Sequence, residues 1–286
     1  MQTSSAAPVV VGVTGTAASL AAVRLAAREA VARQRELRVV HVFTWPAPHH
    51  GAEATAYGPA RREAAAIVDR AVTSASHGAP GVRVTGQVLD GAPARVLLQL
   101  SRSAELLVVG DEGLAGAPRV PVDSVLLQTA SRAFCPTVVA RGPRPPAGPL
   151  LVGVDGSASS VRALRYAAAE ARHRGTGVEV VHVMREPAHE AEGTRLLAGA
   201  VAAVPELVRP RTRLLTGDPA ATLARASRSA RMVVVAPRGR DRSALLGPVA
   251  QELLRRCACP TLFVHGTTAE RHGSVGTVPS AGALAG

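Results

Sequence analysis

Lysine is absent from this chain of 286 residues, and aromatic residues are scarce. All 33 basic residues are arginines, and Phe, Tyr and Trp together make up 2% of the sequence. RNA-binding modules that stack bases on aromatic rings need more rings than this. We therefore expect aliphatic cores and no nucleic-acid partner. The aromatic residues are Phe43, Trp45, Tyr57, Phe134, Tyr166 and Phe263.

Cysteine is rare as well: the chain has three, without the paired C-x-x-C motifs that bind zinc. We expect Cys135, Cys257 and Cys259 to be reduced and mostly buried, and we expect no disulfides. The C-x-C spacing of the last two differs from a C-x-x-C redox motif, which argues against a redox role.

Histidines do not form a pattern that would bind a metal. His41 and His182 stand at equivalent positions of an internal repeat, and no second ligand lies at a suitable spacing from either. This favours a structural role for both. His49 and His50 have neither cysteines nor a carboxylate pattern around them. We expect no histidine metal site.

No apolar run approaches the roughly 20 residues that a membrane helix needs, and the first Arg stands at position 24, so the basic start of a signal peptide is missing. We expect a cytoplasmic protein with no membrane partner. The net charge is +12. Two interpretations stay open: an arginine surface for a polyanion, or the codon usage of a GC-rich genome, which the even spread of charge favours.

A long internal repeat sets the domain organisation. The segment 11–19 recurs at 152–160, the segment 101–104 at 227–230, and the segment 135–137 at 259–261. The repeat predicts two homologous domains, at 8–142 and 149–265. A Pro-rich linker at 143–148 would join them. We expect an N-terminal tail at 1–7 and a disordered tail at 266–286.

Short apolar runs alternate with helical patterns in each copy. Val9–Val13 and Leu150–Val154 have the pattern of strands buried on both faces of a parallel sheet, and Thr16 or Ser157 would cap the helix that follows. Five strands and four helices predict right-handed βαβ units, a sheet of order 3-2-1-4-5, and ligand binding at the carboxyl ends of strands one and four. The other expected strands are Leu37–Phe43, Val82–Val88, Leu106–Gly110, Thr137–Ala140, Val178–Met184, Thr212–Leu215, Met232–Ala236 and Thr261–Val264.

Five short motifs resemble the universal stress protein family over nearly the whole chain. They are VGV-[D/T]-G-[S/T] at strand one, His-Val on strand two, G-x-P before the third helix, Val-Val-Gly at strand four, and Cys-Pro before the last strand. The resemblance implies an α/β protein with two Rossmann-like (adenine nucleotide alpha hydrolase-like) domains in tandem, each an open five-stranded parallel sheet with helices on both faces.

The resemblance also implies where a nucleotide would bind. In nucleotide-binding members, a strand-one Asp and the backbone at the end of strand two hold ribose and adenine, and a G-x2-G-x9-G-[S/T] loop wraps the phosphates. Glycines let backbone N–H groups approach an anion, and the N-terminus of the following helix favours negative charge.

The second copy keeps part of this pattern. Its loop is Ala236-Pro237-Arg238-Gly239, then seven residues, then Gly247-Pro248. Compared with the family motif, it lacks the first glycine, two loop residues and the hydroxyl of the final Ser or Thr. Pro248 also has no N–H, although proline can begin a helix. Arginines at 238, 240 and 242 either compensate electrostatically or form a solvated loop. The resemblance places a nucleotide site at Asp155, Val183, Arg238, Gly239 and Gly247.

The first copy keeps the spacing but has changed residues. Thr14 replaces the strand-one Asp, Asp123 replaces the third glycine, and Asp111 and Glu112 add negative charge to the loop. We expect weak or absent triphosphate binding at this degenerate site. Alternatively, Asp123 simply caps the following helix. The resemblance assigns this site to Thr14, Val42, Gly110, Gly113 and Ser124.

The sequence supports no catalysis, because it has no G-x-S-x-G elbow, P-loop or H-E-x-x-H motif; a weak ATPase activity stays open. We expect a stress-response regulatory or sensing module with an adenine-nucleotide (ATP) site, better kept in the second domain, and Mg²⁺ only with ATP. We also expect pairing of the two domains through their last strands, and a homodimer. The alternative is a nucleotide-independent protein-interaction scaffold in which both sites have decayed.

Overall fold

The structure, a computed structural model, describes residues 6–45, 53–112, 114, 120–121, 123–142, 147–239 and 245–266, without the side chains of residues 53–55. Most of the predicted linker, and all but Gly266 of the predicted C-terminal tail, lie outside these residues. Among the described residues, no helix is both long enough and apolar enough to span a bilayer.

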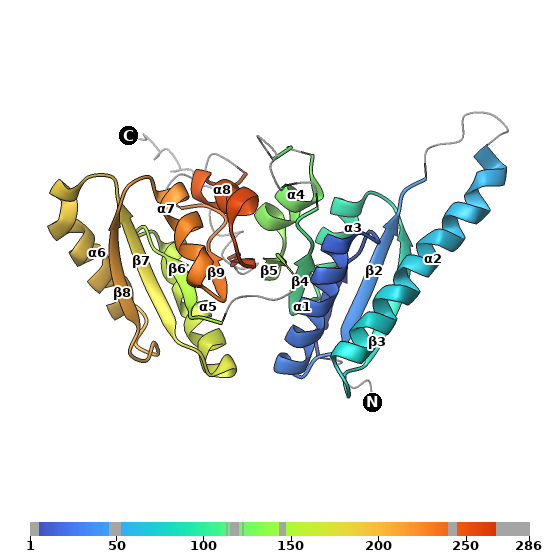
Figure 1. Ribbon diagram of the computed structural model, residues 1–286, viewed down its shortest axis with the longest axis horizontal. Helices are drawn as coiled ribbons and strands as arrows, with labels where there is room; N and C mark the ends of the chain where they lie inside the picture. Colours follow the sequence, from blue (N-terminus) through green and yellow to red (C-terminus); the bar gives the residue numbers. More distant parts are fainter. Residues whose placement is uncertain are drawn as a thin grey trace, which may run out of the picture.

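The N-terminal half alternates strands with helices from blue to green in Figure 1. Its strands are β1 Val9–Gly12, β2 Leu37–Phe43, β3 Val84–Asp90, β4 Leu106–Val109 and β5 Thr137–Val139. Its helices are α1 Ala17–Arg33, α2 Glu53–Gly78, α3 Pro93–Leu100 and α4 Val125–Arg132.

The C-terminal half repeats this order. Its strands are β6 Leu150–Gly153, β7 Val178–Met184, β8 Arg211–Thr216, β9 Met232–Val235 and β10 Thr261–Phe263. Its helices are α5 Ala158–Arg174, α6 Glu190–Ala202, α7 Pro219–Ala226 and α8 Pro248–Arg256, with short 3-10 turns at Pro187–His189 and Ser227–Ser229.

The predicted α/β class is confirmed. The strands form one sheet in the order β3-β2-β1-β4-β5-β10-β9-β6-β7-β8, so each half has the order 3-2-1-4-5, and all pairs within a half are parallel. Strand β3 begins two residues later than predicted, because the N–H of Val82 closes a turn onto the carbonyl of Ala79.

Both first helices begin where the sequence predicts. The hydroxyl of Thr16 accepts from the N–H of Ser19, and the hydroxyl of Ser157 accepts from the N–H of Ser160. These N-caps satisfy amide groups that have no partner inside the helix. They fix the turns by which the chain leaves β1 and β6.

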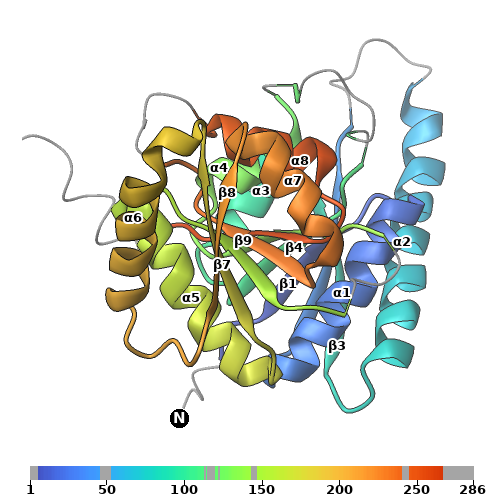
Figure 2. The same ribbon diagram turned by 60° about the vertical axis from the view of Figure 1, so that its left-hand side comes forward.

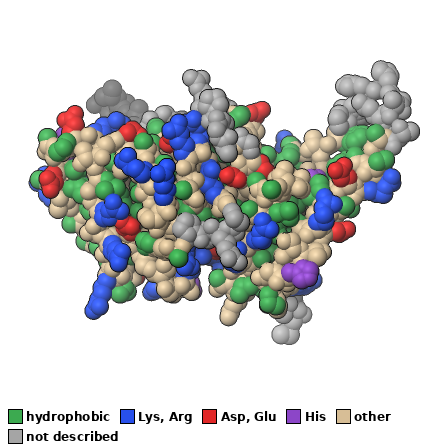
Figure 3. All heavy atoms as spheres, viewed as in Figure 1, with side chains coloured by type: hydrophobic (Ala, Val, Ile, Leu, Met, Phe, Trp, Pro, Cys, Tyr) green, Lys and Arg blue, Asp and Glu red, His purple; other side chains and the backbone are tan. Residues whose placement is uncertain are grey.

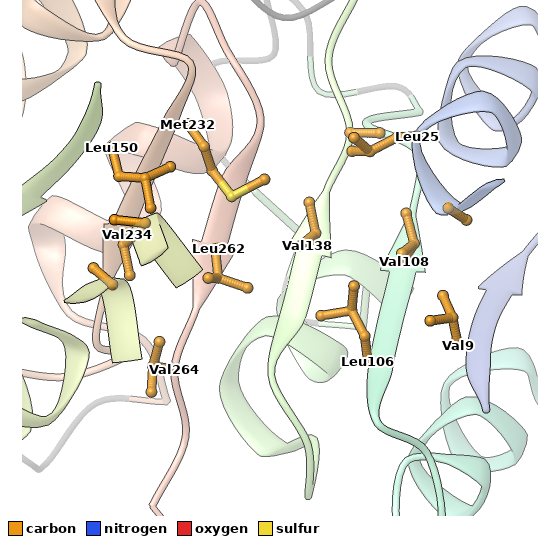
Figure 4. Close-up of a cluster of buried hydrophobic side chains, with 14 of the residues drawn as sticks. Val9, Leu25, Leu106, Val108, Val138, Leu150, Met232, Val234, Leu262 and Val264 are labelled. Atoms are coloured by element: carbon orange, nitrogen blue, oxygen red, sulfur yellow. The ribbon is translucent and has the colours of Figure 1, made fainter. Parts of the chain in front are cut away.

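Helices cover both faces of the sheet (Figure 2). One buried cluster lies beneath α1, α2, α5 and α6, and a second lies beneath α3, α4, α7 and α8. Both clusters contain residues from both halves. In Figure 4, Val138 on β5 and Leu262 on β10 face each other where the halves meet, and these two residues pair in the antiparallel ladder.

Four buried charges link α1 to α5 beside this ladder. Arg33 bonds Glu170 at 2.7 Å, and Arg174 bonds Glu29 at 2.5 Å, so each half supplies one arginine and one glutamate. Glu29 is 1% exposed and Glu170 is 6% exposed. Arg33 also donates to the hydroxyl of Tyr166, whose pKa is raised by burial and by the charge of Glu170. We call the ladder and these charges the seam.

A second symmetric pair links the other face of the seam. Arg141 follows β5 and donates to the carbonyl of Leu254 on α8, while His265 follows β10 and hydrogen-bonds the carbonyl of Ala130 on α4 at 2.9 Å. Arg141 also bonds Asp111 at 3.1 Å. The end of α8 is therefore tied to the loop that follows β4 in the other half.

Removing one charge of the seam should destabilise the protein. In Glu29→Gln, the guanidinium groups of Arg33 and Arg174 would lose one of the two buried carboxylates between them, so we expect a loss of about 3 kcal/mol in the free energy of unfolding. Urea denaturation followed by circular dichroism measures it. The control is Glu36→Gln, at the more exposed pair with Arg38, where we expect a loss of under about 1 kcal/mol. Equal losses in the two variants would contradict this role of the seam.

Candidate functional site

A cavity of about 260 Å³ opens at the carboxyl ends of the C-terminal strands. Its wall contains all five residues that the sequence predicts for this half: Asp155, Val183, Arg238, Gly239 and Gly247. Three elements bring them together, because β6, β7 and β9 all end at this edge of the sheet. The N-terminus of α8 completes the wall. Most of the other lining side chains are aliphatic.

Asp155 is held in one orientation at the start of α5. Its Oδ1 accepts from the backbone N–H of Ser157 at 3.0 Å and from the hydroxyl of the same residue at 2.5 Å. Both donors belong to the N-cap of α5, whose end favours negative charge. The carboxylate is half-buried. Oδ1 accepts both of these bonds, and Oδ2 lies on the side of Gly239.

Gly239 lies directly against this carboxylate. A Cβ at this position would overlap Oδ2 of Asp155, so only glycine fits while the carboxylate keeps its place. The neighbouring backbone is fixed too, because the hydroxyl of Ser159 donates to the carbonyl of Arg238 at 2.9 Å. The Arg238 side chain itself is exposed at the wall of the cavity.

Helix α8 begins at the wall of the cavity without a side-chain cap. Gly247 is its N-cap residue and Pro248 its first helical residue. The N–H of Gly247 donates to the carbonyl of Pro237 at 2.9 Å, which closes the loop between them. Of the predicted arginines, residues 240 and 242 lie outside the described residues.

The two strand-two histidines hold strand ends together. Nδ1 of His41 lies 2.8 Å from the carbonyl of Val13, and Nδ1 of His182 lies 2.8 Å from the carbonyl of Val154. A carbonyl can only accept, so Nδ1 carries the proton in both rings. Among the described residues, no group of three His, Cys, Asp or Glu side chains is placed to hold a metal ion.

In the N-terminal half, the carboxylate beside the start of α1 comes from Glu112, in the loop after β4, and not from the end of the first strand. Oε1 of Glu112 accepts from the hydroxyl of Thr14 at 2.6 Å and from that of Thr16 at 2.8 Å. Thr16 is the N-cap of α1, as Ser157 is of α5. Sequence reasoning treated Glu112 only as added negative charge. The repeat aligns Glu112 with Arg238. This reversal of charge between the two halves is the sequence signal that could have indicated a different role for Glu112.

The other predicted residues of this half have structural roles. The hydroxyl of Ser124 caps α4 by accepting from the N–H of Leu127 at 3.1 Å. The suggestion that Asp123 caps this helix is therefore wrong. A Cβ on Gly110 would come within 2.9 Å of the α1 backbone at Ala18, so this glycine allows close packing. Val42 is half-buried on β2, and Gly113 lies outside the described residues.

All three cysteines are buried and free of disulfides. The sulfur atoms of Cys257 and Cys259 lie 3.9 Å apart. This contact and burial raise the pKa of Cys259, which keeps its thiol protonated. Cys257 is the C-cap residue of α8.

Comparison with known proteins places this geometry in context. The model of the universal stress protein family matches twice, over residues 7–141 and 147–265. Universal stress protein Rv2005c of Mycobacterium tuberculosis is 32% identical, over 89% of this chain and 95% of the relative. A universal stress protein of Mycolicibacterium smegmatis is 29% identical, over 90% of this chain and 96% of that relative.

Among solved structures, a universal stress protein from Archaeoglobus fulgidus superposes with a TM-score of 0.71 at 15% identity. The match covers 90% of this chain and 97% of that one. At this identity the likeness shows the fold alone.

The close approach of Gly239 to Asp155 can be tested by adding a methyl group. In Gly239→Ala, the carboxylate must leave its hydrogen bonds to Ser157, and we expect a loss of about 1 to 3 kcal/mol in the free energy of unfolding. Urea denaturation measures it. Gly177→Ala is the control, because nothing lies within 4 Å of a Cβ there. If the two variants were equally stable, Asp155 would not be held as described.

Proposed function

The chain belongs to the universal stress protein family, with two copies of the family domain in tandem, and on this premise we propose that its C-terminal half binds an adenine nucleotide. The observation that carries the proposal is the cavity at Asp155, Gly239 and Gly247. Aliphatic walls suit a purine base, and a fixed carboxylate suits sugar hydroxyls, because a carboxylate accepts strong hydrogen bonds. We propose no catalytic step.

The N-terminal half contributes no second nucleotide in this proposal. Glu112 holds the hydroxyls of Thr14 and Thr16, which line the place where Asp155 stands in the other half. A nucleotide there would have to break these bonds and bring its phosphates close to Glu112. We propose one nucleotide per chain. If ATP binds, Mg²⁺ would accompany it.

The occupied pocket could signal through α8. One end of this helix lines the cavity at Gly247, and the other end accepts a hydrogen bond from Arg141 across the seam. A shift of α8 on binding would therefore change contacts with the N-terminal half. We propose a regulatory or sensing role on this basis, and the predicted cytoplasmic location and homodimer stay predictions.

The surface charge favours no separate polyanion site. Arginine side chains are spread over both halves of the face in Figure 3. Several arginines of the chain pair with acids, including Arg61 with Asp90 at 2.5 Å and Arg213 with Glu179 at 2.8 Å. Paired and scattered arginines agree better with the composition of the chain than with a binding surface.

Replacing Asp155 should abolish most of the binding. Asn keeps the Oδ1 acceptor for Ser157 but loses the charge, so we expect Asp155→Asn to weaken adenine-nucleotide binding about 10-fold to 100-fold. Isothermal titration calorimetry of the full chain with AMP, ADP and ATP measures this. Thr14→Val, at the equivalent position of the other half, should change no affinity.

Two results would reject the proposed function. One is that none of the three nucleotides binds the unmodified chain, which would favour the interaction scaffold. The other is that Asp155→Asn binds as tightly as the unmodified chain does.

A further inference from the structure

The first turn of α8 offers few donors to an anion. An α-helix leaves its first four N–H positions without partners inside the helix. At α8 the N–H of Gly247 already donates to the carbonyl of Pro237, and Pro248 has no N–H. Two amide groups remain, those of Val249 and Ala250, and both residues line the cavity. Gly247 has no side chain that could cap them.

The internal repeat shows what this half lacks. In the N-terminal half the N-cap residue of α4 is Ser124, whose hydroxyl accepts from the N–H of Leu127. The N-cap residue of α8 is Gly247, which has no hydroxyl, and Pro248 at the first helical position has no N–H. A chain of three phosphates needs several donors along its length. The described wall supplies a place for one anionic group, at the amides of Val249 and Ala250.

The charge of the wall leads to the same conclusion. Asp155 and Arg238 are the charged residues of the cavity wall as the structure describes it, and their charges cancel. Arg238 is exposed, so solvent screens its attraction for an anion. Oδ2 of Asp155 lies on the side of Gly239, where the loop begins. Each added phosphate would bring more negative charge near this carboxylate.

We propose that the C-terminal pocket selects adenine nucleotides with a single phosphate over ATP. This inference rests on the proposed function, because it names the ligand class of the same site. The base and sugar lie in the aliphatic cavity beside Asp155, and the single phosphate accepts from the amides of Val249 and Ala250.

Calorimetry on the full chain with AMP and with ATP, each without and with Mg²⁺, tests the inference. We expect AMP to bind at least 10-fold more tightly than ATP under both conditions. Equal affinities, or tighter binding of ATP, would overturn the inference while the proposed function stands. Failure of both nucleotides to bind would reject the proposed function itself.

A variant of α8 gives a second measurement. Pro248→Ser adds one N–H and one hydroxyl at the first helical position of α8. We expect it to narrow the preference for AMP over ATP at least 3-fold. Pro93→Ser is the control, because Pro93 begins α3 in the N-terminal half and does not line this cavity. An unchanged ratio in Pro248→Ser, or the same narrowing in the control, would contradict the role of Pro248.

Discussion

The structure depends on the seam between its two halves. Without it, β5 and β10 would expose unpaired, apolar edges, which are prone to aggregation. The seam pairs these edges in an antiparallel ladder and buries Glu29, Arg33, Glu170 and Arg174 beside it. Burial disfavours the charged form of Arg174, but Glu29 and Glu170 together outweigh this effect and raise the pKa of the guanidinium group. Four charges that neutralise one another only in this arrangement fix how the halves meet.

The same repeat that builds the seam also makes the two halves unequal. Equivalent positions carry Asp155 and Thr14 just after the first strand of each half, and Arg238 and Glu112 in the loops after the fourth. The C-terminal half therefore keeps its carboxylate just beyond the end of β6 and has a cavity beside it. The other brings a carboxylate from the loop and bonds it to the N-cap hydroxyl of α1. Helix α8 joins the open pocket to the seam.

Sequence patterns predicted the framework of this arrangement well. The apolar runs marked all ten strands, and the repeat brought Asp155, Gly239 and Gly247 to one sheet edge. Sequence patterns did not predict the hydrogen bond between Glu112 and Thr14, because the direction of the Glu112 side chain depends on the backbone conformation of the loop after β4. The sequence could not decide between Asp123 and Ser124 as the N-cap of α4, because Asp and Ser cap helices equally well. The backbone shows that Ser124 is the N-cap residue. The seam charges were visible as a repeated Glu-x3-Arg, but their pairing depends on how the halves meet.

A crystal structure of the full chain grown with AMP would test the central claim most directly. The account predicts density for one nucleotide per chain, beside Asp155 and the first turn of α8, with Glu112 still bonded to Thr14 and Thr16. Density for a nucleotide beside Thr14 with Glu112 turned away, or an empty pocket at Asp155, would contradict it.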